Sequence, residues 1–160
     1  MSKFLFIIPL LTSLVFLPVS QAATPQATTN RTVKMSSFNL SSQKWKNRVL
    51  LVFAPSSDNS AYQEQMQIFS EEKAAFLDRD LVLVQVLATG ESYANGQKID
   101  ENSAVELRDR FDVSKNNFRV ILVGKDGGAK RQDTVPVKAK AIFNEIDAMP
   151  MRQEEMRLKK

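Results

Sequence analysis

Two serine hydroxyls, with an acid and an amide between them, are the clearest candidates for chemistry in this chain. The segment is Ser57-Asp58-Asn59-Ser60, and it follows the apolar run 49–54 and Pro55. A buried strand that ends in a turn is a place where folds often present functional side chains. The chain contains no cysteine and no histidine. Thiol chemistry and Ser-His-Asp catalysis are therefore excluded, because neither the thiolate nor the imidazole base exists.

A catalytic serine in this segment would need another base. A lysine amine can activate a serine hydroxyl, but the nearest lysines in the sequence are Lys46 and Lys73, and only folding could bring one close. The alternative function is accordingly an enzyme of unknown reaction that uses the cleft around Ser57 and Ser60, with Ser57 or Arg119 contributing.

The same four residues have two non-catalytic interpretations. Ser, Asp and Asn are the side chains preferred at helix N-caps, where a cap stabilises the fold by about 1 kcal/mol. Ser60 followed by Gln63 also fits a capping box. A helix N-terminus flanked by hydroxyls can instead bind an anion or a carboxylate group. The residue types favour the cap, and Ser57, Asp58, Asn59 and Ser60 remain candidates for binding.

The elements that must position this segment follow from the apolar pattern. The continuous apolar runs 49–54 and 81–87 predict two strands that are buried on both faces. Between them, Tyr62, Met66 and Phe69 recur at helical spacing, which predicts a helix that ends near Asp78. A strand, a helix and a strand in this order favour parallel pairing through a right-handed crossover.

The second half of the chain supplies the rest of a sheet. A short edge strand is predicted within 36–42, and a polar loop with an Asn95-Gly96 turn over 88–100. A helix opened by a Ser103/Glu106 capping box and running to about Phe111 follows, and then a strand 118–123, a turn at Lys125-Asp126-Gly127-Gly128 and a strand over about 130–134. The last predicted elements are a helix opened by Pro136 and stopped by Pro150, and one or two helical turns over 151–158. The order β-α-β-α-β-β-α predicts an α/β, thioredoxin-like fold with a central mixed sheet flanked by helices.

The N-terminal residues have the pattern of a secretory signal peptide. Lys3 precedes an apolar run over 4–17 and a small-x-small site that ends at Ala22. This predicts a signal peptide over 1–22, a flexible leader over 23–37 and a thioredoxin-like domain over 38–158. The apolar run is short for a bilayer, so no transmembrane anchor is expected after cleavage, and the expected location is periplasmic or secreted.

The charge pattern limits the partners. The formal net charge is +4, with basic and acidic residues interleaved, which is typical of a solvated surface rather than of a stripe that binds nucleic acid. Without cysteine or histidine only oxygen-ligated cations could bind, and no calcium-loop pattern occurs, so neither a metal nor a cofactor is predicted. Tyr93 in the 88–99 loop is a candidate for protein binding, since exposed tyrosines favour interfaces.

Several segments carry a resemblance to known proteins. The 52–60 segment resembles the active-site segment of thioredoxins, with Ser57 and Ser60 on the two cysteine positions. Redox thioredoxins also place a cis-proline where this chain has Asn116-Asn117-Phe118-Arg119, so the resemblance implies no redox role.

A closer resemblance is to a cysteine-poor, thioredoxin-like family of unknown function. Four segments carry it: Trp45-Lys46-Asn47-Arg48-Val49-Leu50, Phe53-Ala54-Pro55, Val123-Gly124-Lys125-Asp126-Gly127-Gly128 and Ile146-Asp147-Ala148-Met149-Pro150-Met151-Arg152-Gln153-Glu154-Glu155-Met156. The family occurs in small exported bacterial proteins and in animal sushi-repeat and extracellular-matrix proteins. The resemblance implies the fold and export, and no reaction.

The sequence therefore predicts an exported, non-catalytic thioredoxin-like module that binds a protein or peptide and has no thiol-disulfide activity. The candidate binding residues are Ser57, Asp58, Asn59, Ser60, Tyr93 and Arg119. A purely structural envelope component is a third interpretation.

Overall fold

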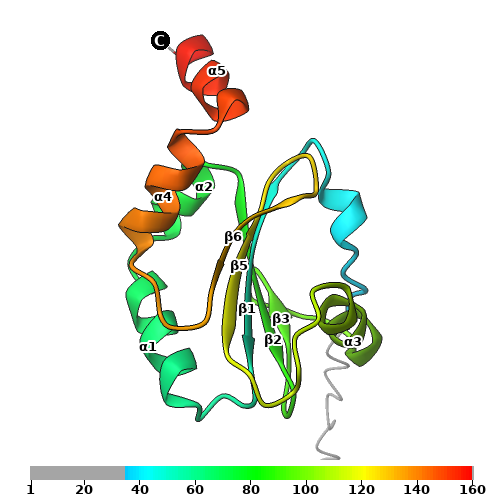
Figure 1. The fold of residues 1–160 in the computed structure, drawn as a ribbon. Helices are drawn as coiled ribbons and strands as arrows, with labels where there is room; N and C mark the ends of the chain where they lie inside the picture. Colours follow the sequence, from blue (N-terminus) through cyan, green and yellow to red (C-terminus); the bar gives the residue numbers. More distant parts are fainter. Residues whose placement is uncertain (1–34, 160) are drawn as a thin grey trace, which may run out of the picture. The chain divides into compact units, whose positions relative to one another are not determined.

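The computed structural model describes residues 35–159 (Figure 1). The expected signal peptide, 1–22, and the expected leader up to residue 34 lie outside the described residues. Just after them, Ser36 forms a parallel bridge with Ile99. The Ser36 N–H donates to the carbonyl of Lys98 at 3.1 Å.

A six-stranded mixed sheet forms the centre, in the order β4-β3-β2-β1-β5-β6. The strands are β1 (Arg48–Ala54), β2 (Leu81–Leu87), β3 (Tyr93–Ala94), β4 (Gln97–Lys98), β5 (Arg119–Val123) and β6 (Ala129–Asp133). β1 and β2 are parallel, and the pairs β1–β5, β2–β3, β3–β4 and β5–β6 are antiparallel. The predicted α/β fold with a mixed central sheet is confirmed.

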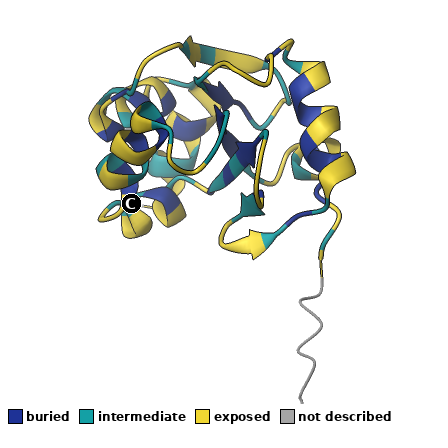
Figure 2. Ribbon diagram, turned by 90° about the horizontal axis from the view of Figure 1, so that it is seen from below, coloured by how far each residue is buried: buried dark blue, intermediate teal, exposed yellow. Residues whose placement is uncertain are grey.

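Helices cover both faces of the sheet (Figure 1). They are the 3-10 helix η1 (Leu40–Gln43) and the α-helices α1 (Ser60–Phe69), α2 (Lys73–Asp78), α3 (Glu101–Arg110), α4 (Ala139–Asp147) and α5 (Pro150–Leu158). The helices α1, α2 and α4 lie on one face, and α3 and η1 lie on the other. Figure 2 shows the central strands buried, while the helices each turn one side to the solvent.

β1 explains why this arrangement is stable. All seven of its residues are buried, because successive side chains of a strand point to opposite faces. Leu50, Val52 and Ala54 enter the core under α1 and α4. Val49 and Leu51 enter the core under α3. One strand therefore supplies both hydrophobic layers.

The helix predicted to run to Asp78 is divided. α1 ends at Phe69 and α2 begins at Lys73. The Ser70 hydroxyl donates to the carbonyl of Gln67 at 2.8 Å, and a serine that bonds its own backbone in this way competes with the helix. The apolar period continues across the break, since the rings of Phe69 and Phe76 lie 5.4 Å apart, edge to face.

Two helix starts differ from the prediction. α3 is capped by Asp100, whose Oδ1 accepts the Ser103 N–H at 2.8 Å, so Ser103 is not the cap. The Ser103 hydroxyl instead accepts the Phe38 N–H at 2.9 Å. α4 begins at Ala139 rather than at Pro136, because the buried amide of Gln65 takes both backbone groups of Val137, at 2.8 and 2.9 Å.

Other differences concern short segments. The stretch 36–42, expected as an edge strand, contains only the Ser36 bridge and the start of η1. The loop 88–100 contains the β3–β4 hairpin, with positive φ at Asn95 and Gly96, as a two-residue turn of this type requires. Pro150 stops no helix, since it is the first residue of α5, a position that proline suits.

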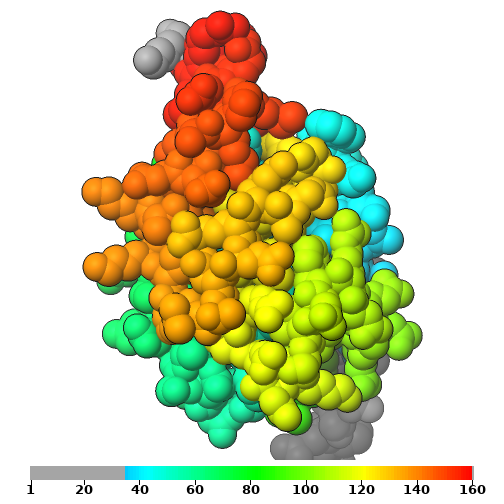
Figure 3. All heavy atoms as spheres, in the orientation of Figure 1, coloured from blue at the N-terminus to red at the C-terminus, as the bar shows by residue number. Residues whose placement is uncertain are grey.

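The two ends of the sheet carry different elements (Figure 1). We call the end where β1 and β2 finish the carboxyl end; the loops after β1, β2 and α3 gather there. We call the opposite end the amino end; it holds the α2–β2 turn, the β5–β6 turn and α5. Figure 3 shows α5 at this end, beyond α4 and beside the segment that contains β6.

Candidate functional site

The β1–α1 turn presents the Ser57–Ser60 segment as a helix cap. Asn59 is the N-cap, and its Oδ1 accepts the Tyr62 N–H at 3.0 Å. Ser60 is the first helical residue, so the capping box expected from Ser60 and Gln63 does not form. A hydrogen bond from Ser56 lowers the pKa of Asp58.

The arrangement around these serines lacks a base. Ser57 and Ser60 are exposed. Among residues 35–159 neither hydroxyl hydrogen-bonds with another side chain, a lysine amine included. The hydroxyls have no activating partner, and nothing in this geometry favours a nucleophilic serine.

Tyr93 lies in β3 and points to a partner within its own hairpin. Its hydroxyl donates to Glu91 at 2.6 Å, and the same carboxylate pairs with the Lys98 amine. The hydrogen bond with Glu91 raises the pKa of Tyr93. The polar loop expected here, with its Asn95-Gly96 turn, therefore contains a hairpin that these contacts brace.

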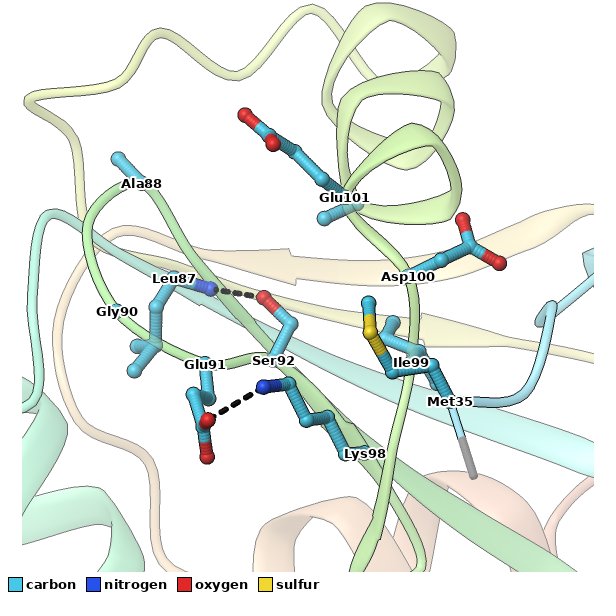
Figure 4. A pocket seen from close by; sticks show the side chains of 11 residues that line it. Met35, Leu87, Ala88, Gly90, Glu91, Ser92, Lys98, Ile99, Asp100 and Glu101 are labelled. Atoms are coloured by element: carbon cyan, nitrogen blue, oxygen red, sulfur yellow. Dashed lines mark hydrogen bonds and ion pairs between the residues drawn. The ribbon is translucent and has the colours of Figure 1, made fainter. Parts of the chain in front are cut away.

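A cavity of about 300 Å³ lies beside this hairpin, at the carboxyl end. Figure 4 shows Lys98 reaching across to Glu91, and the Ser92 hydroxyl meeting the Leu87 N–H. The carboxylates of Asp100 and Glu101 point in different directions. The polar groups of this cavity are thus either paired with one another or turned apart, and they do not converge on a common point.

Arg119 is the first residue of β5, opposite Phe53 of β1. Ile121 and Val123, at the same alternation along β5, belong to the core under α3, so Arg119 shares that face. Its Nε is buried without a hydrogen-bond partner, and no other bond or ion pair from its guanidinium occurs among residues 35–159. Of the predicted site residues, this one is chemically unsatisfied.

Arg108 of α3, which the sequence analysis did not single out, lines the same cavity as Arg119. It is 6% exposed. Its Nη2 donates to the carbonyls of Ala54 and Val86, at 2.6 and 2.9 Å, and its Nη1 donates to the carbonyl of Ser114 at 3.1 Å. The buried guanidinium thus ties α3 to the ends of both parallel strands, and burial lowers the pKa of Arg108.

The sequence signal that could have identified Arg108 is the presence of an arginine within the buried stripe of α3. Arg108 follows the core residue Leu107 and lies one turn beyond the core residue Ala104. A charge at that position either has a partner or serves a function, and the amphipathic pattern alone does not distinguish the two.

Arg108 and Arg119 line one open cleft of about 630 Å³ at the carboxyl end. We call it the arginine cleft. Its lining residues come from α3, the α3–β5 loop and the start of β5: Val105, Arg108, Asp109, Asp112, Val113, Ser114, Lys115, Asn117 and Arg119. Within the described chain, neither Asp109 nor Asp112 forms an ion pair with Arg108 or Arg119. The buried and half-buried charges of the cleft, Arg108 and Arg119, are therefore positive, whereas its exposed charges, Asp109, Asp112 and Lys115, have both signs.

The amino end holds a second charged cluster, which the sequence analysis also missed. We call it the ion network; its members are Arg48, Asp78, Arg79, Asp80, Lys125, Asp147, Arg152, Glu155 and Lys159. Arg48, 1% exposed, donates to both carboxylate oxygens of Glu155 at 3.2 Å. Lys125 approaches the same carboxylate at 2.8 Å.

Three of the four motif segments contribute residues to the ion network. Arg48 belongs to the first of them, Lys125 to the third, and Asp147, Arg152 and Glu155 to the fourth. Residues far apart in sequence thus converge on one set of ion pairs. Burial would raise the pKa of Glu155, but the hydrogen bonds from Lys125 and Arg48 outweigh it and hold that pKa below its ordinary value.

The predicted binding residues do not form one site. The segment Ser57–Ser60 caps α1, Tyr93 braces a hairpin, and Arg119 lines the arginine cleft, which includes neither of the others. Within residues 35–159 no three acidic side chains cluster closely enough to hold a metal ion. None of the helices in this range is long and apolar enough to span a membrane.

Comparison with protein families gives one match over most of the chain. Residues 39–155 match the model of a family described as "Domain of unknown function (DUF4174)". Curated relatives include coiled-coil domain-containing protein 80 of Danio rerio, 28% identical over 133 residues, and sushi repeat-containing protein SRPX of Homo sapiens, 29% identical over 114 residues. The matches cover 73% and 69% of this chain but 15% and 25% of those proteins. The resemblance drawn from the four motif segments is confirmed.

Solved structures show the same fold. The reduced 2-Cys peroxiredoxin of Plasmodium vivax matches with a TM-score of 0.56 at 15% identity, covering 73% of this chain and 85% of that chain. A thioredoxin peroxidase of Plasmodium yoelii matches with a TM-score of 0.54 at 16% identity, covering 72% and 79%. These proteins have the thioredoxin fold, and at such identity the likeness extends to the fold alone.

Proposed function

Because this chain belongs to the DUF4174 family, whose matched region here forms a cysteine-free thioredoxin fold, we propose that it is an exported binding module for a protein or peptide. The absence of cysteine from the whole chain excludes thiol-disulfide exchange. The signal-peptide pattern of residues 1–22 supports export. The proposal is export in general, since neither the relatives nor the described residues favour a periplasm.

The observation that carries the binding function is the arginine cleft. It is open, has a volume of about 630 Å³, and lies at the carboxyl end of two parallel strands, where folds of this class commonly bind their ligands. Its two arginines have no carboxylate partner among the described residues. In the ion network, by contrast, buried Arg48 and Arg152 are both paired with carboxylates.

The cleft also suits a polypeptide. The α3–β5 loop forms one wall, and Ser114, Lys115 and Asn117 are exposed there. Hydroxyl, amine and amide groups at a rim can meet the backbone and side chains of an extended segment. The Ser57–Ser60 segment belongs to the neighbouring loop, so we propose it as a secondary contact rather than as the site.

The test is site-specific crosslinking from the full chain in cells that export it. A photo-crosslinking amino acid replaces Asn117 in the cleft or, as the matched control, exposed Lys140 on α4. We expect a discrete adduct from position 117 that an excess of the unmodified protein suppresses, and none from position 140. No adduct at 117, or the same adducts from both positions, would contradict the proposal.

A serine-directed covalent probe tests the enzymatic alternative. We expect no labelling of Ser57 or Ser60, because neither hydroxyl has an activating base within the described residues. Stoichiometric labelling of Ser57, abolished by Ser57→Ala, would establish the alternative in place of the binding module.

A further inference from the structure

We propose that the arginine cleft recognises a carboxylate group of its ligand, with Arg119 as the contact and Arg108 as the charged floor beneath it. This inference rests on the proposed function, because it names the chemistry that the same cleft would take. The observation behind it is a pair of arginines that share one cavity and have no carboxylate partner among residues 35–159.

The cleft contains a buried positive charge, that of Arg108. The side chain is 6% exposed, and its three hydrogen bonds go to backbone carbonyls. Carbonyl dipoles satisfy N–H groups but do not neutralise the cation, and a buried charge without a counter-ion is costly. Its Nε–H is buried and has no acceptor between residues 35 and 159. A carboxylate in the cleft would supply the missing negative charge.

Arg119 is the cation of the cleft that we expect a ligand to contact. Its side chain is partly exposed, so a ligand can reach it. Its guanidinium makes no hydrogen bond to any of the described residues, and since its Nε is buried, the two terminal amino groups form the fork that remains without an acceptor. That fork matches the two oxygens of a carboxylate and can bind them with parallel hydrogen bonds.

The remaining charges of the cleft distinguish a carboxylate from a phosphate. Asp109 and Asp112 line the same cavity as Arg108, Lys115 and Arg119. With three cations and two anions the lining has a net charge of +1, which a singly charged carboxylate neutralises and which a phosphate, with up to about two negative charges at neutral pH, would exceed. The balance therefore favours a C-terminal carboxylate, or an Asp or Glu side chain, over a phosphate.

The experiment follows the arginine Nε–H signals of the full chain by NMR during titration with defined probes. The probes are Ac-Gly-Ala-Gly with a free carboxylate, Ac-Gly-Glu-Gly-amide, the neutral Ac-Gly-Ala-Gly-amide, and inorganic phosphate. We expect saturable shifts at Arg108 and Arg119 with at least one carboxylate peptide, none with the neutral peptide, and weaker effects with phosphate. The stronger of the two carboxylate peptides identifies the source of the group.

Matched variants assign the effect to the cleft. Arg119→Gln should weaken binding of the carboxylate peptide by roughly tenfold or more, since a charged hydrogen bond is lost. Arg110→Gln removes the same charge from exposed Arg110 of α3, which does not line the cleft, and should change binding by no more than about twofold. Asp112→Asn should tighten binding, and asparagine tolerates the positive φ at that position.

The outcomes separate this inference from the proposed function. Shifts with the neutral peptide equal to those with the carboxylate peptides, or unchanged affinity in Arg119→Gln, would refute carboxylate recognition. If position 117 still crosslinks a partner while no carboxylate probe binds, the binding module stands and this inference falls. If the crosslink fails as well, the proposed function falls with it.

Discussion

Buried arginines at the two ends of the sheet have different kinds of hydrogen-bond acceptor. At the amino end, Arg48 is 1% exposed and shares two hydrogen bonds with the carboxylate of Glu155. At the carboxyl end, Arg108 is 6% exposed, and its acceptors among the described residues are all backbone carbonyls. Arg48, Arg108 and Arg119 each have a buried Nε that finds no hydrogen-bond acceptor in the part of the chain that the structure describes. The difference is therefore that the buried arginine at the amino end is paired with a carboxylate, whereas the one at the carboxyl end is not paired with any carboxylate of the described residues.

This difference separates structure from binding. A carboxylate neutralises the charge of a buried cation, and removing either partner leaves an uncompensated charge. A buried cation without one keeps a capacity for an anion that arrives from outside. The first arrangement accounts for the family motifs at the amino end, and the second indicates where a ligand should be sought. Four predictions test this contrast.

The largest effect is expected at the ion network. Glu155→Gln should lower the free energy of unfolding by about 3 kcal/mol, because it leaves the fully buried Arg48 without its counter-ion. The measurement is urea denaturation monitored by circular dichroism. The neighbouring Glu154, whose only ion pair within residues 35–159 is with exposed Arg157, gives the control: Glu154→Gln should cost no more than about 0.5 kcal/mol. Equal losses in both variants would show that the network is not the structural element we infer.

Acid should remove part of the same stabilisation. The pKa of folded Glu155 lies below its ordinary value of 4.5. Its stabilising contribution is therefore complete above about pH 4.5 and is lost as the pH falls through the lowered pKa. The pKa of Asp78 is also lowered, by hydrogen bonds from Lys159 and Arg152, so it acts in the same direction. Thermal melts between neutral pH and pH 3 should show a steeper fall for the wild type than for Glu155→Gln. Parallel curves would contradict this.

A smaller effect is expected at the β1–α1 turn. Asn59→Ala should destabilise the fold by about 1 kcal/mol, since the Tyr62 N–H loses its acceptor. The paired change Ser57→Ala and Ser60→Ala should cost less, because neither hydroxyl is bonded to another side chain in the described structure. Denaturation midpoints at constant slope distinguish the two. A larger loss from the serine pair would restore the serines as the cap.

The fold was predictable because its signals are local or repetitive. Continuous apolar runs marked β1 and β2, helical spacing marked α1 and α4, and paired glycines marked the β5–β6 turn. The break at Ser70 was not predictable, since the apolar period runs through it and a single hydroxyl–carbonyl bond decides the backbone path. The cap of α3 was misplaced because Asp100 and Ser103 are both good capping residues, and only the fold selects one.

The site was only partly predictable, for a different reason. Arg119 was identified, but its partner Arg108 lies within an amphipathic helix, where sequence spacing does not show what a charge will meet. The motif segments were correctly read as a family signature. The pairing of Arg48 in the first segment with Glu155 in the fourth depends on contacts between distant parts of the chain that no local pattern encodes.

The smallest expected effect is the sharpest test of the contrast. Arg119→Met should change the free energy of unfolding by less than about 0.5 kcal/mol, because Arg119 donates no hydrogen bond to the described residues and the hydrocarbon of methionine preserves the packing. The corresponding change at the amino end, Arg48→Met, should cost about 3 kcal/mol, since the carbonyl of Arg79 loses its bond from Arg48 and Glu155 loses two of its hydrogen bonds while its bond to Lys125 remains. Urea denaturation of both variants measures the difference directly. A loss of more than about 2 kcal/mol for Arg119→Met would mean that Arg119 is structural, and the two ends would then be alike. A negligible loss, together with weaker binding of a carboxylate peptide, would mean that this arginine is kept for a ligand rather than for the fold.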